Sequence, residues 1–424
     1  MRVTKTFIQQ IIVLVLYILN AVHGRQYADK VLLISMDGFR WDYIQKANTP
    51  NFDKFAQHGV KASYINNTFI TKTFPCHYSI ATGLYEESHG IIGNVMYDPG
   101  FNETFTMGTK DPKWWNGGEP IWVTARKNGK NSAAFFWPGS ESKIHGYYAN
   151  IWKPYEKSVP FKTRVDTVIK WLTDPCHVTN VAVMYFHEPD ATGHEFGPDS
   201  MEVQRKVTEM DGILGYLMDA FEKNNLWKSV NVIVTSDHGM TEIDFKNKVV
   251  DISDYVNMKN VITVDSGPIM QIIPQGNITN LKDEIFRNLS GKANFTIYKK
   301  EDIPDFWHYK NNRRVMPLFA VADEGWTLTT NRTAIGSVNE HGAHGYDNRL
   351  NSMKPIFYAR GPNFVKNQTT EPFMSLDIYP MICELLGIQP SANNGSLARV
   401  KHLLVKGNFT DVHATCSACG LQLN

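Results

Sequence analysis

Residues 30–38 read Lys-Val-Leu-Leu-Ile-Ser-Met-Asp-Gly, a short apolar run that ends at an acidic residue. Two further runs have the same form: residues 181–186 lead into His-Glu-Pro-Asp, and residues 230–235 lead into Ser-Asp-His-Gly. Continuous apolar runs of this length predict strands that are buried on both faces, as in a largely parallel sheet. The acidic residues are therefore expected at the ends of neighbouring strands.

Helical patterns lie between these strands, at residues 50–58, 161–172 and 203–224. In the last of them, apolar residues recur at three-to-four spacing and form one stripe: Val207, Met210, Leu214, Leu217 and Phe221. Alternation of strands and helices predicts an α/β doubly wound sheet, largely parallel, with helices on both faces. Its ligand site belongs outside the carboxyl ends of the strands.

The pattern loosens at residues 257–334 into short runs separated by Gly, Pro and Asn, which predicts a small inserted α+β portion. We expect one catalytic domain over residues 25–404 and a loose tail over residues 405–424. The chain has 43 Lys and Arg against 42 Asp and Glu, and no basic run. This balance argues against nucleic acid as a bulk electrostatic partner.

The N-terminus has the layout of a cleaved secretory signal, with Arg2 and Lys5 before an apolar segment and small residues up to Gly24. We therefore expect residues 1–24 to be removed; a retained signal anchor is the alternative, although the apolar segment is short for a span. No later stretch is long enough to cross a bilayer. The sequence predicts an extracellular, secreted glycoprotein, or a cell-surface one if an anchor is missing from it.

Export is also indicated by nine Asn-x-Ser/Thr triplets without Pro. They begin at Asn66, Asn102, Asn277, Asn288, Asn294, Asn331, Asn367, Asn394 and Asn408.

The five cysteines are Cys76, Cys176, Cys383, Cys416 and Cys419. In an oxidising compartment disulfides form, but an odd number leaves at least one cysteine free or paired with another chain. The C-x-x-C at residues 416–419 lacks the context of a redox or zinc site. Cys76 precedes His77, and a thiolate beside an imidazole is an activated nucleophile, so a thiol enzyme is one alternative.

Carboxylates and imidazoles gather at the predicted strand ends: Asp37, Asp190, His194, Asp237, His238 and His344. Taken singly, an acidic residue after a strand is usually a turn or helix cap. Taken together at one sheet edge, the six residues could hold a pair of metal ions and leave positions open for substrate. Mixed His and carboxylate ligands without Cys favour zinc over magnesium or calcium.

Seven segments, in this order along the chain, resemble the catalytic domain of the ectonucleotide pyrophosphatase/phosphodiesterases of the alkaline phosphatase superfamily. They are LLISMDGFR, FITKTFPCHYSIATGLYEESHGIIGN, PIWVTA, FFWPGS, EPDATGHEFGP, SDHGM and HGYDN. The resemblance covers about residues 29–404 and looks closest to the short type-four and type-five members. It implies a hydrolase that cleaves phosphodiester or pyrophosphate bonds of nucleotides.

Carried over by position, the resemblance implies that Asp37, Asp237, His238 and Thr73 hold one zinc ion, and that Asp190, His194 and His344 hold the other. Thr73 would be the nucleophile and would form a phosphothreonyl intermediate, and Asn94 would support the phosphoryl oxygens. In that scheme His77 has a packing or hydrogen-bonding role. Phe74 and Tyr155 would sandwich the base, with Trp137 and Lys110 in the same pocket, although aromatic residues here could merely be core.

Two departures from the family pattern concern the site. The family writes Asn where this chain has Cys76, and a thiol cannot replace the donors of an amide. A cysteine pair in the loop after SDHGM is missing as well. Two alternatives therefore stay open: a choline phosphodiesterase acting on lysophospholipids, and a catalytically weak surface interaction protein that kept the fold. The oligomeric state is not predicted.

Overall fold

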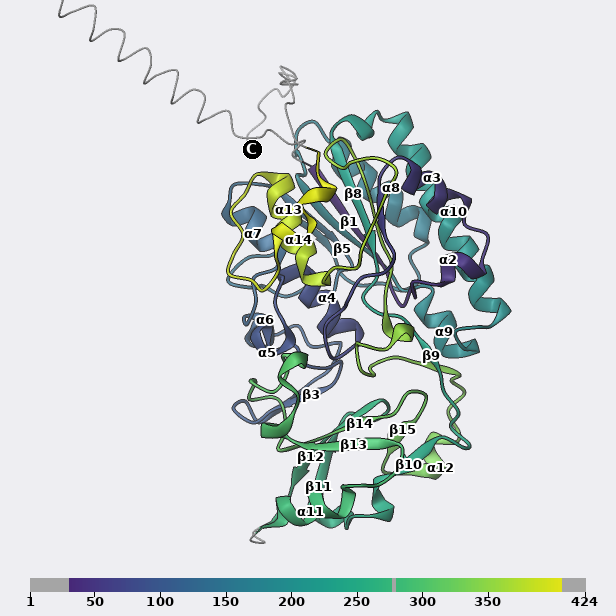
Figure 1. Cartoon of the computed structure of the whole chain (residues 1–424). Helices are drawn as coiled ribbons and strands as arrows, with labels where there is room; N and C mark the ends of the chain where they lie inside the picture. The colour runs from purple at the N-terminus through teal and green to yellow at the C-terminus, as the bar shows by residue number, and fades with distance from the viewer. Residues whose placement is uncertain (1–29, 277–279, 406–424) are drawn as a thin grey trace, which may run out of the picture.

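The computed structural model describes residues 30–276 and 280–405, and an eight-stranded sheet forms its centre (Figure 1). Across this sheet the strand order is β18-β2-β17-β8-β1-β7-β5-β6. The strands are β1 (Lys30–Met36), β2 (Val60–Ala62), β5 (Ser132–Phe135), β6 (Ile151–Lys153), β7 (Val181–Phe186), β8 (Val230–Thr235), β17 (Phe357–Arg360) and β18 (Gln368–Thr370). The three strands predicted from the sequence are all present.

Strand β1 lies between β7 and β8 and runs parallel to both. Met36 pairs with Phe186, and Ser35 pairs with Thr235, so the three strands end level with one another. The residues that follow them therefore meet at one sheet edge. Strand β5 is also parallel to β7, whereas β17 is antiparallel to its neighbours, which makes the sheet mixed but largely parallel.

Helices cover both faces of the sheet because side chains alternate along each strand. In β1, Val31 and Leu33 pack into one apolar core, and Leu32 and Ile34 pack into the other. Figure 1 shows α3, α8 and α10 on one side of the sheet and α7 and α13 on the other. The helices over the sheet are α2 (Tyr43–Lys46), α3 (Pro50–Gln57), α4 (Thr73–Thr82), α7 (Ile121–Lys127), α8 (Phe161–Thr173), α9 (Asp190–Phe196), α10 (Met201–Lys223), α13 (Ile378–Leu386) and α14 (Leu397–Val400).

The three helices predicted from the sequence correspond to α3, α8 and α10, with bounds that differ by one or two residues. The apolar stripe of α10 is buried against the sheet and its neighbouring helices. Short elements between β2 and β5 complete this part of the chain: α5 (Glu86–His89), β3 (Met96–Asp98), β4 (Glu103–Phe105) and α6 (Pro112–Trp115).

The inserted α+β portion lies at the lower end of Figure 1 and has its own antiparallel sheet, ordered β11-β12-β14-β13. Its elements are β10 (Val249–Asp251), β11 (Val261–Val264), β12 (Ile269–Pro274), α11 (Leu281–Leu289), β13 (Phe295–Lys299), β14 (Leu318–Ala322), β15 (Thr327–Thr329) and α12 (Arg332–Ile335). Because β10 pairs with β15, the portion begins before residue 257, where the sequence pattern placed its start. The strand pair β9 (Thr241–Glu242) and β16 (Gly342–Ala343) then returns the chain to the large sheet.

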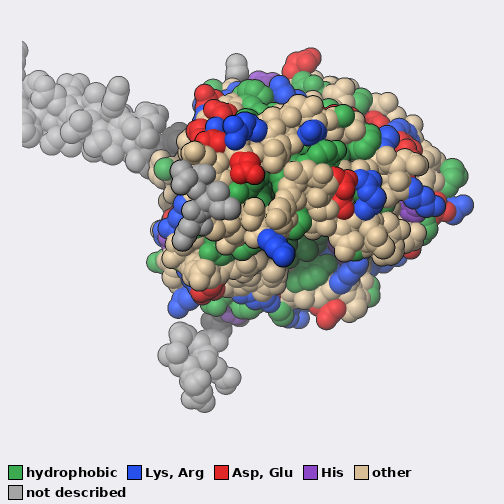
Figure 2. All heavy atoms as spheres, turned by 90° about the horizontal axis from the view of Figure 1, so that it is seen from below, with side chains coloured by type: hydrophobic (Ala, Val, Ile, Leu, Met, Phe, Trp, Pro, Cys, Tyr) green, Lys and Arg blue, Asp and Glu red, His purple; other side chains and the backbone are tan. Residues whose placement is uncertain are grey.

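Outside the described residues lie the predicted signal peptide, nearly all of the tail, and the sequons at Asn277 and Asn408. Five other sequon asparagines are exposed, and Asn66 and Asn294 are partly buried; the exposed ones are Asn102, Asn288, Asn331, Asn367 and Asn394. Within residues 30–276 and 280–405, no helix has the length and apolar character that crossing a membrane requires. Figure 2 shows acidic and basic side chains interspersed on the face seen from below.

Candidate active site

The predicted metal ligands converge at the carboxyl edge of the sheet. Asp37 follows β1, Asp237 and His238 follow β8, and Asp190 begins α9 after β7. His344 arrives from the distant part of the chain, immediately after β16. The side chains of Asp37, Asp237 and His238 are almost completely buried. The level ends of three parallel strands thus bring together residues that are up to 201 positions apart, Asp37 and His238.

One cluster consists of Asp190, His194 and His344. Asp190 and His194 stand four residues apart on α9, so both side chains lie on one face of the helix. The Nε2 atom of His194 is 3.5 Å from Asp190 Oδ2, and Nε2 of His344 is 3.6 Å from Asp190 Oδ1. Three such atoms within 4.8 Å of one another could hold a metal ion.

The second cluster surrounds His238. Its Nε2 atom lies 3.0 Å from Asp237 Oδ2, 3.5 Å from Asp37 Oδ1 and 3.5 Å from Thr73 Oγ1. The ring of His238 also stacks on that of His344, with centroids 3.5 Å apart. The two clusters therefore adjoin, and Thr73 lies against one of them.

Backbone carbonyls orient all three histidines in the same way. In each ring Nδ1 lies within hydrogen-bond distance of a carbonyl oxygen, which assigns the proton to Nδ1 and leaves the lone pair on Nε2 for a metal. The pairs are His194 with Gly342 (2.8 Å), His238 with Gly239 (2.9 Å) and His344 with Thr71 (2.8 Å).

The carboxylates of these clusters need a cation. Oδ1 of Asp37, Oδ1 of Asp190 and Oδ2 of Asp237 are buried and accept no hydrogen bond from the part of the chain that the structure describes. Burial, and then the neighbouring carboxylates Asp237 and Asp190, raise the pKa of Asp37 well above its usual value. With its proton on Nδ1, His238 also points a lone pair at an Asp237 oxygen 3.0 Å away. Divalent metal ions would relieve both the charge repulsion and the facing lone pairs, so the residues fit such ions.

His77 is placed differently from the other three histidines. Its Nδ1 lies 2.8 Å from the carbonyl oxygen of Thr73, and its Nε2 lies 2.8 Å from Ser35 Oγ. Nδ1 is also 3.2 Å from Asp237 Oδ2. Both ring nitrogens are occupied by hydrogen-bond partners, so His77 fits the hydrogen-bonding role expected for it.

Thr73 begins helix α4, and Asn94 fixes the following residue. The backbone N–H of Phe74 donates to Asn94 Oδ1 at 2.9 Å. This contact assigns the amide oxygen of Asn94 and leaves its Nδ2 group as a donor toward the cavity that both residues line. A hydroxyl and an amide donor thus lie beside the two clusters that could hold metal ions.

Cys76 lies one turn further along α4 and is buried. Its Sγ is 3.4 Å from the carbonyl oxygen of Ile70, and burial raises the pKa of its thiol well above the usual value. A thiol nucleophile needs a lowered pKa and access to substrate. The thiol-enzyme alternative is therefore wrong, and Cys76 packs beneath the first turn of α4.

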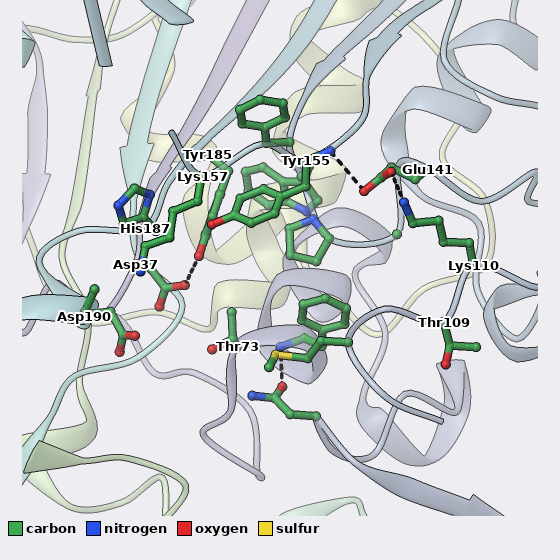
Figure 3. A pocket seen from close by; sticks show the side chains of 18 of the residues that line it. Asp37, Thr73, Thr109, Lys110, Glu141, Tyr155, Lys157, Tyr185, His187 and Asp190 are labelled. Atoms are coloured by element: carbon green, nitrogen blue, oxygen red, sulfur yellow. Dashed lines mark hydrogen bonds and ion pairs between the residues drawn. The ribbon is translucent and has the colours of Figure 1, made fainter. Parts of the chain in front are cut away.

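A cavity of about 550 Å³ opens in front of Thr73 (Figure 3). Phe74 and Tyr155 both line it, and Tyr155 is 45% exposed, so its ring is available to a ligand. Glu141 accepts a hydrogen bond from the backbone N–H of Tyr155 at 3.2 Å and pairs with Lys110. The aromatic wall is therefore held in place by an ion-paired carboxylate.

Two residues predicted to contact the substrate already make contacts within the protein that the sequence did not predict. The Trp137 side chain lines the cavity but is only 1% exposed, and its indole N–H donates to the His77 carbonyl at 3.1 Å. The charge of Lys110 is neutralised by Glu141. Both residues line the cavity, and their contacts to the substrate stay predictions.

Sequence reasoning missed several residues that line the cavity. Tyr185 donates a hydrogen bond to Asp37 Oδ2 at 2.6 Å. Lys157 and His187 lie on the same side as the Asp37 and Asp190 carboxylates (Figure 3). Tyr185 falls within a continuous apolar run, in which no alternation of polar and apolar residues distinguishes it from core residues. Lys157 is an exposed lysine in a loop, and its sequence context does not distinguish it from other surface lysines.

Comparison with known proteins agrees with this geometry. Residues 31–347 match the family described as Type I phosphodiesterase / nucleotide pyrophosphatase. The chain belongs to this family. As a phosphodiesterase/nucleotide pyrophosphatase it is a hydrolase, and the predicted family resemblance is confirmed.

Individual relatives of this phosphodiesterase align over most of their length. It is 42% identical to bis(5'-adenosyl)-triphosphatase enpp4 of Xenopus laevis, over 93% of this chain and 86% of that protein. It is 41% identical to human ectonucleotide pyrophosphatase/phosphodiesterase family member 5, over 88% of this chain and 78% of that protein. A solved structure of murine family member 5, an inactive threonine-to-alanine variant in complex with AMP, superposes with a TM-score of 0.85 at 42% identity, covering 89% of this chain and 100% of that one. The alkaline-phosphatase-like fold is thereby established.

Proposed function

We propose that this phosphodiesterase is an extracellular two-zinc enzyme that hydrolyses nucleotide pyrophosphates and releases a 5′-nucleotide. The observation that carries the proposal is the position of Thr73 Oγ1, 3.5 Å from Nε2 of His238 at the edge of the second cluster. A hydroxyl at that position can attack a phosphorus atom held between the two clusters.

The donor set supports zinc. Asp190, His194 and His344 would hold one ion. Asp37, Asp237, His238 and Thr73, which lie together around the His238 ring, would hold the other. Imidazole nitrogen is a poor ligand for the hard cations. When bound, the ions supply Lewis-acid stabilisation of phosphoryl charge and favour the ionised form of a bound hydroxyl.

The protein groups then carry out a two-step displacement. Thr73 Oγ1 forms a bond to phosphorus while the bond from phosphorus to the leaving oxygen breaks, which gives a nucleotidyl ester of Thr73. A water oxygen next displaces Thr73 and releases the nucleotide. The Nδ2 group of Asn94 donates to a phosphoryl oxygen and stabilises the charge that builds there. In the murine relative, a threonine-to-alanine variant is described as inactive, which supports the role of Thr73.

Aromatic residues favour a nucleotide as the substrate. The rings of Phe74 and Tyr155 line the same cavity, and a base can stack between such rings. AMP is bound by the murine relative, and the Xenopus relative is named a bis(5'-adenosyl)-triphosphatase. We infer dinucleoside polyphosphates, nucleoside diphosphates and triphosphates, and dinucleotide cofactors as the substrate class. No feature of the described cavity specifically favours a choline lipid.

The secretory signal at residues 1–24 and the exposed sequon asparagines support an extracellular glycoprotein. The catalytic domain extends in this proposal over residues 25–404. The intact metal-binding clusters argue against the alternative of a weak interaction protein, because neither cluster lacks a predicted member.

A substrate panel tests the proposal. The purified protein is offered p-nitrophenyl thymidine monophosphate, ADP and a lysophosphocholine, with and without a chelator. Chelator-sensitive release of nucleotide is expected from the first two. No release from any of the three would contradict the enzyme, and a preference for the lipid would contradict the substrate class alone.

A further inference from the structure

A second hollow of about 670 Å³ adjoins the catalytic cavity. Two residues, Lys157 and His187, line both spaces and so form the boundary between them. The hollow continues from there between the start of α8 and one face of α10, where Lys206 and Gly212 lie. Both volumes fall within the range of about 300–1,000 Å³ that is usual for small-molecule sites.

Lys157 brings an available positive charge to the boundary. The catalytic cavity is lined by two cationic side chains, Lys110 and Lys157. Lys110 pairs with Glu141, whereas no carboxylate of the described chain lies within ion-pair distance of Lys157. In Figure 3 Lys157 reaches toward Asp37 from above, and Thr73 lies below that carboxylate. Lys157 and Thr73 therefore lie on opposite sides of the Asp37 carboxylate in this view.

The backbone that carries Lys157 is rigidly held. Arg164 is completely buried and donates hydrogen bonds to the carbonyl oxygens of Lys157 and Val159, both at 3.1 Å. The same guanidinium donates to the Tyr185 carbonyl at 2.9 Å, at the end of β7. An anchored loop reduces the entropy lost when the lysine binds an anion.

In an in-line displacement the leaving group departs on the side of phosphorus opposite the nucleophile. With Thr73 and Lys157 on opposite sides of the Asp37 carboxylate, the leaving group would depart toward Lys157. For a dinucleoside polyphosphate, this group consists of the remaining phosphates and the second nucleoside. The second nucleoside then needs a space beyond Lys157, and the hollow offers one with apolar surface from Val159 and Phe161.

We propose that Lys157 binds the second phosphate of the substrate and that the hollow beyond it receives the second nucleoside of a dinucleoside polyphosphate. This inference deepens the proposed function and rests on it. It makes Lys157 a determinant of preference for substrates with more than one phosphate, and it makes the hollow a determinant of preference for two nucleosides.

Three substrates separate these two contributions. The p-nitrophenyl ester of thymidine monophosphate has neither a second phosphate nor a second nucleoside, ADP adds the phosphate, and diadenosine triphosphate adds both. Values of kcat/KM are measured with the zinc-loaded full protein, and each variant is judged by the ratios between substrates. Using ratios removes any loss that affects all three substrates equally.

The Lys157→Ala variant is expected to lower kcat/KM for ADP, relative to kcat/KM for the p-nitrophenyl ester, by roughly tenfold. The reason is that charge-assisted contacts to phosphate are among the stronger hydrogen bonds. Lys157→Arg should retain most of the ratio. Lys153→Ala removes a neighbouring exposed lysine that lines neither space and serves as the control, with an unchanged ratio. Equal losses on both substrates, or an unchanged ratio, would overturn the role of Lys157.

Gly212 offers a way to fill the hollow. A Cβ at this helical position meets no atom within 4 Å, and leucine has a higher helix propensity than glycine, so Gly212→Leu is expected to fold. It should lower kcat/KM for diadenosine triphosphate, relative to kcat/KM for ADP, roughly fivefold. Gly212→Ala should change the same ratio less than about twofold. An unchanged ratio in Gly212→Leu would overturn the hollow as a subsite. Failure of the unmodified protein on all three substrates would instead overturn the proposed function and the inference with it.

Discussion

The hydroxyl of Tyr185 donates a 2.6 Å hydrogen bond to Oδ2 of Asp37, the predicted metal ligand at the end of β1. Tyr185 is 8% exposed and comes from the adjacent strand β7, so the contact fixes the carboxylate across the strand pair. Hydrogen bonds to ligands of this kind orient them and tune metal affinity.

Tyr185→Phe is therefore expected to weaken zinc binding by about tenfold or more while the fold is kept, because the ring still fills its place. Competition titration against a zinc-binding dye measures the affinity. Tyr155→Phe is the matched comparison, because it removes a hydroxyl from the same cavity that makes no hydrogen bond to Asp37 in the described structure. Equal zinc affinities of the Tyr185→Phe variant and the unmodified protein would contradict the positioning role.

Cys76→Ala tests the departure from the family pattern. Because the thiol is buried beneath Thr73 and its pKa is raised by burial, we expect turnover to remain within about threefold of the unmodified protein. The free energy of unfolding should fall by about 1 kcal/mol, owing to the small cavity that is left. Steady-state rates and chemical denaturation measure the two effects. Loss of turnover in a folded, zinc-loaded variant would make Cys76 part of the chemistry.

Asp98 links the β3–β4 hairpin to the inserted portion through Arg313 and Arg314, with N···O distances of 2.9 and 2.8 Å. Burial would raise the pKa of Asp98, but the two guanidinium groups outweigh it and lower that pKa to about 2. A lowered pKa in the folded state contributes stability above the usual value of 3.8, and this contribution is lost as the pH falls from about 4 to 2.

Asp98→Ala should accordingly lower the free energy of unfolding by about 3 kcal/mol at neutral pH, since it leaves a nearly buried guanidinium without its partner. Between pH 4 and pH 2, the stability of the variant should decline less steeply than that of the unmodified protein. Denaturant titrations at several pH values give both results. Parallel stability curves for the two proteins would show that the ion pairs do not contribute as described.

Removal of metal should destabilise the protein as well as stop turnover. At a free zinc concentration about 1,000 times the dissociation constant, binding contributes about 4 kcal/mol to folding. Thermal unfolding with and without a chelator measures this as a fall in Tm. The fall should be smaller in Asp190→Asn, in which one cluster has lost its carboxylate charge. An unchanged Tm on chelation, in protein shown to contain zinc beforehand, would argue against the clusters as metal sites.

Much of the fold could be predicted because the decisive signals are local. The apolar runs that become β1, β7 and β8 are buried from Val31, Val181 and Val230 onward, and their lengths identify them as strands. The carboxylates at their ends then had to meet, because parallel strands end at the same edge. The apolar stripe of α10 likewise follows from three-to-four spacing.

Other parts of the site depend on contacts between distant segments. His344 reaches the clusters only because β16 pairs with β9 after the inserted portion, and no local pattern indicates that pairing. Pairing of Lys110 with Glu141 and burial of Trp137 are likewise decided by tertiary packing. Lys157 carries no signal in sequence, since the role proposed for it depends on two tertiary features. No carboxylate among the described residues pairs with it, and Arg164 binds its backbone carbonyl.

The measurement that tests the central claim most directly compares Thr73→Ala and Thr73→Ser with the unmodified protein, recording both zinc content and hydrolysis of diadenosine triphosphate. Thr73→Ala should retain zinc, held by the remaining Asp and His ligands, and lose at least about a thousandfold in kcat. Thr73→Ser should keep measurable turnover because it retains the hydroxyl. Substantial turnover by zinc-loaded Thr73→Ala would contradict Thr73 as the nucleophile.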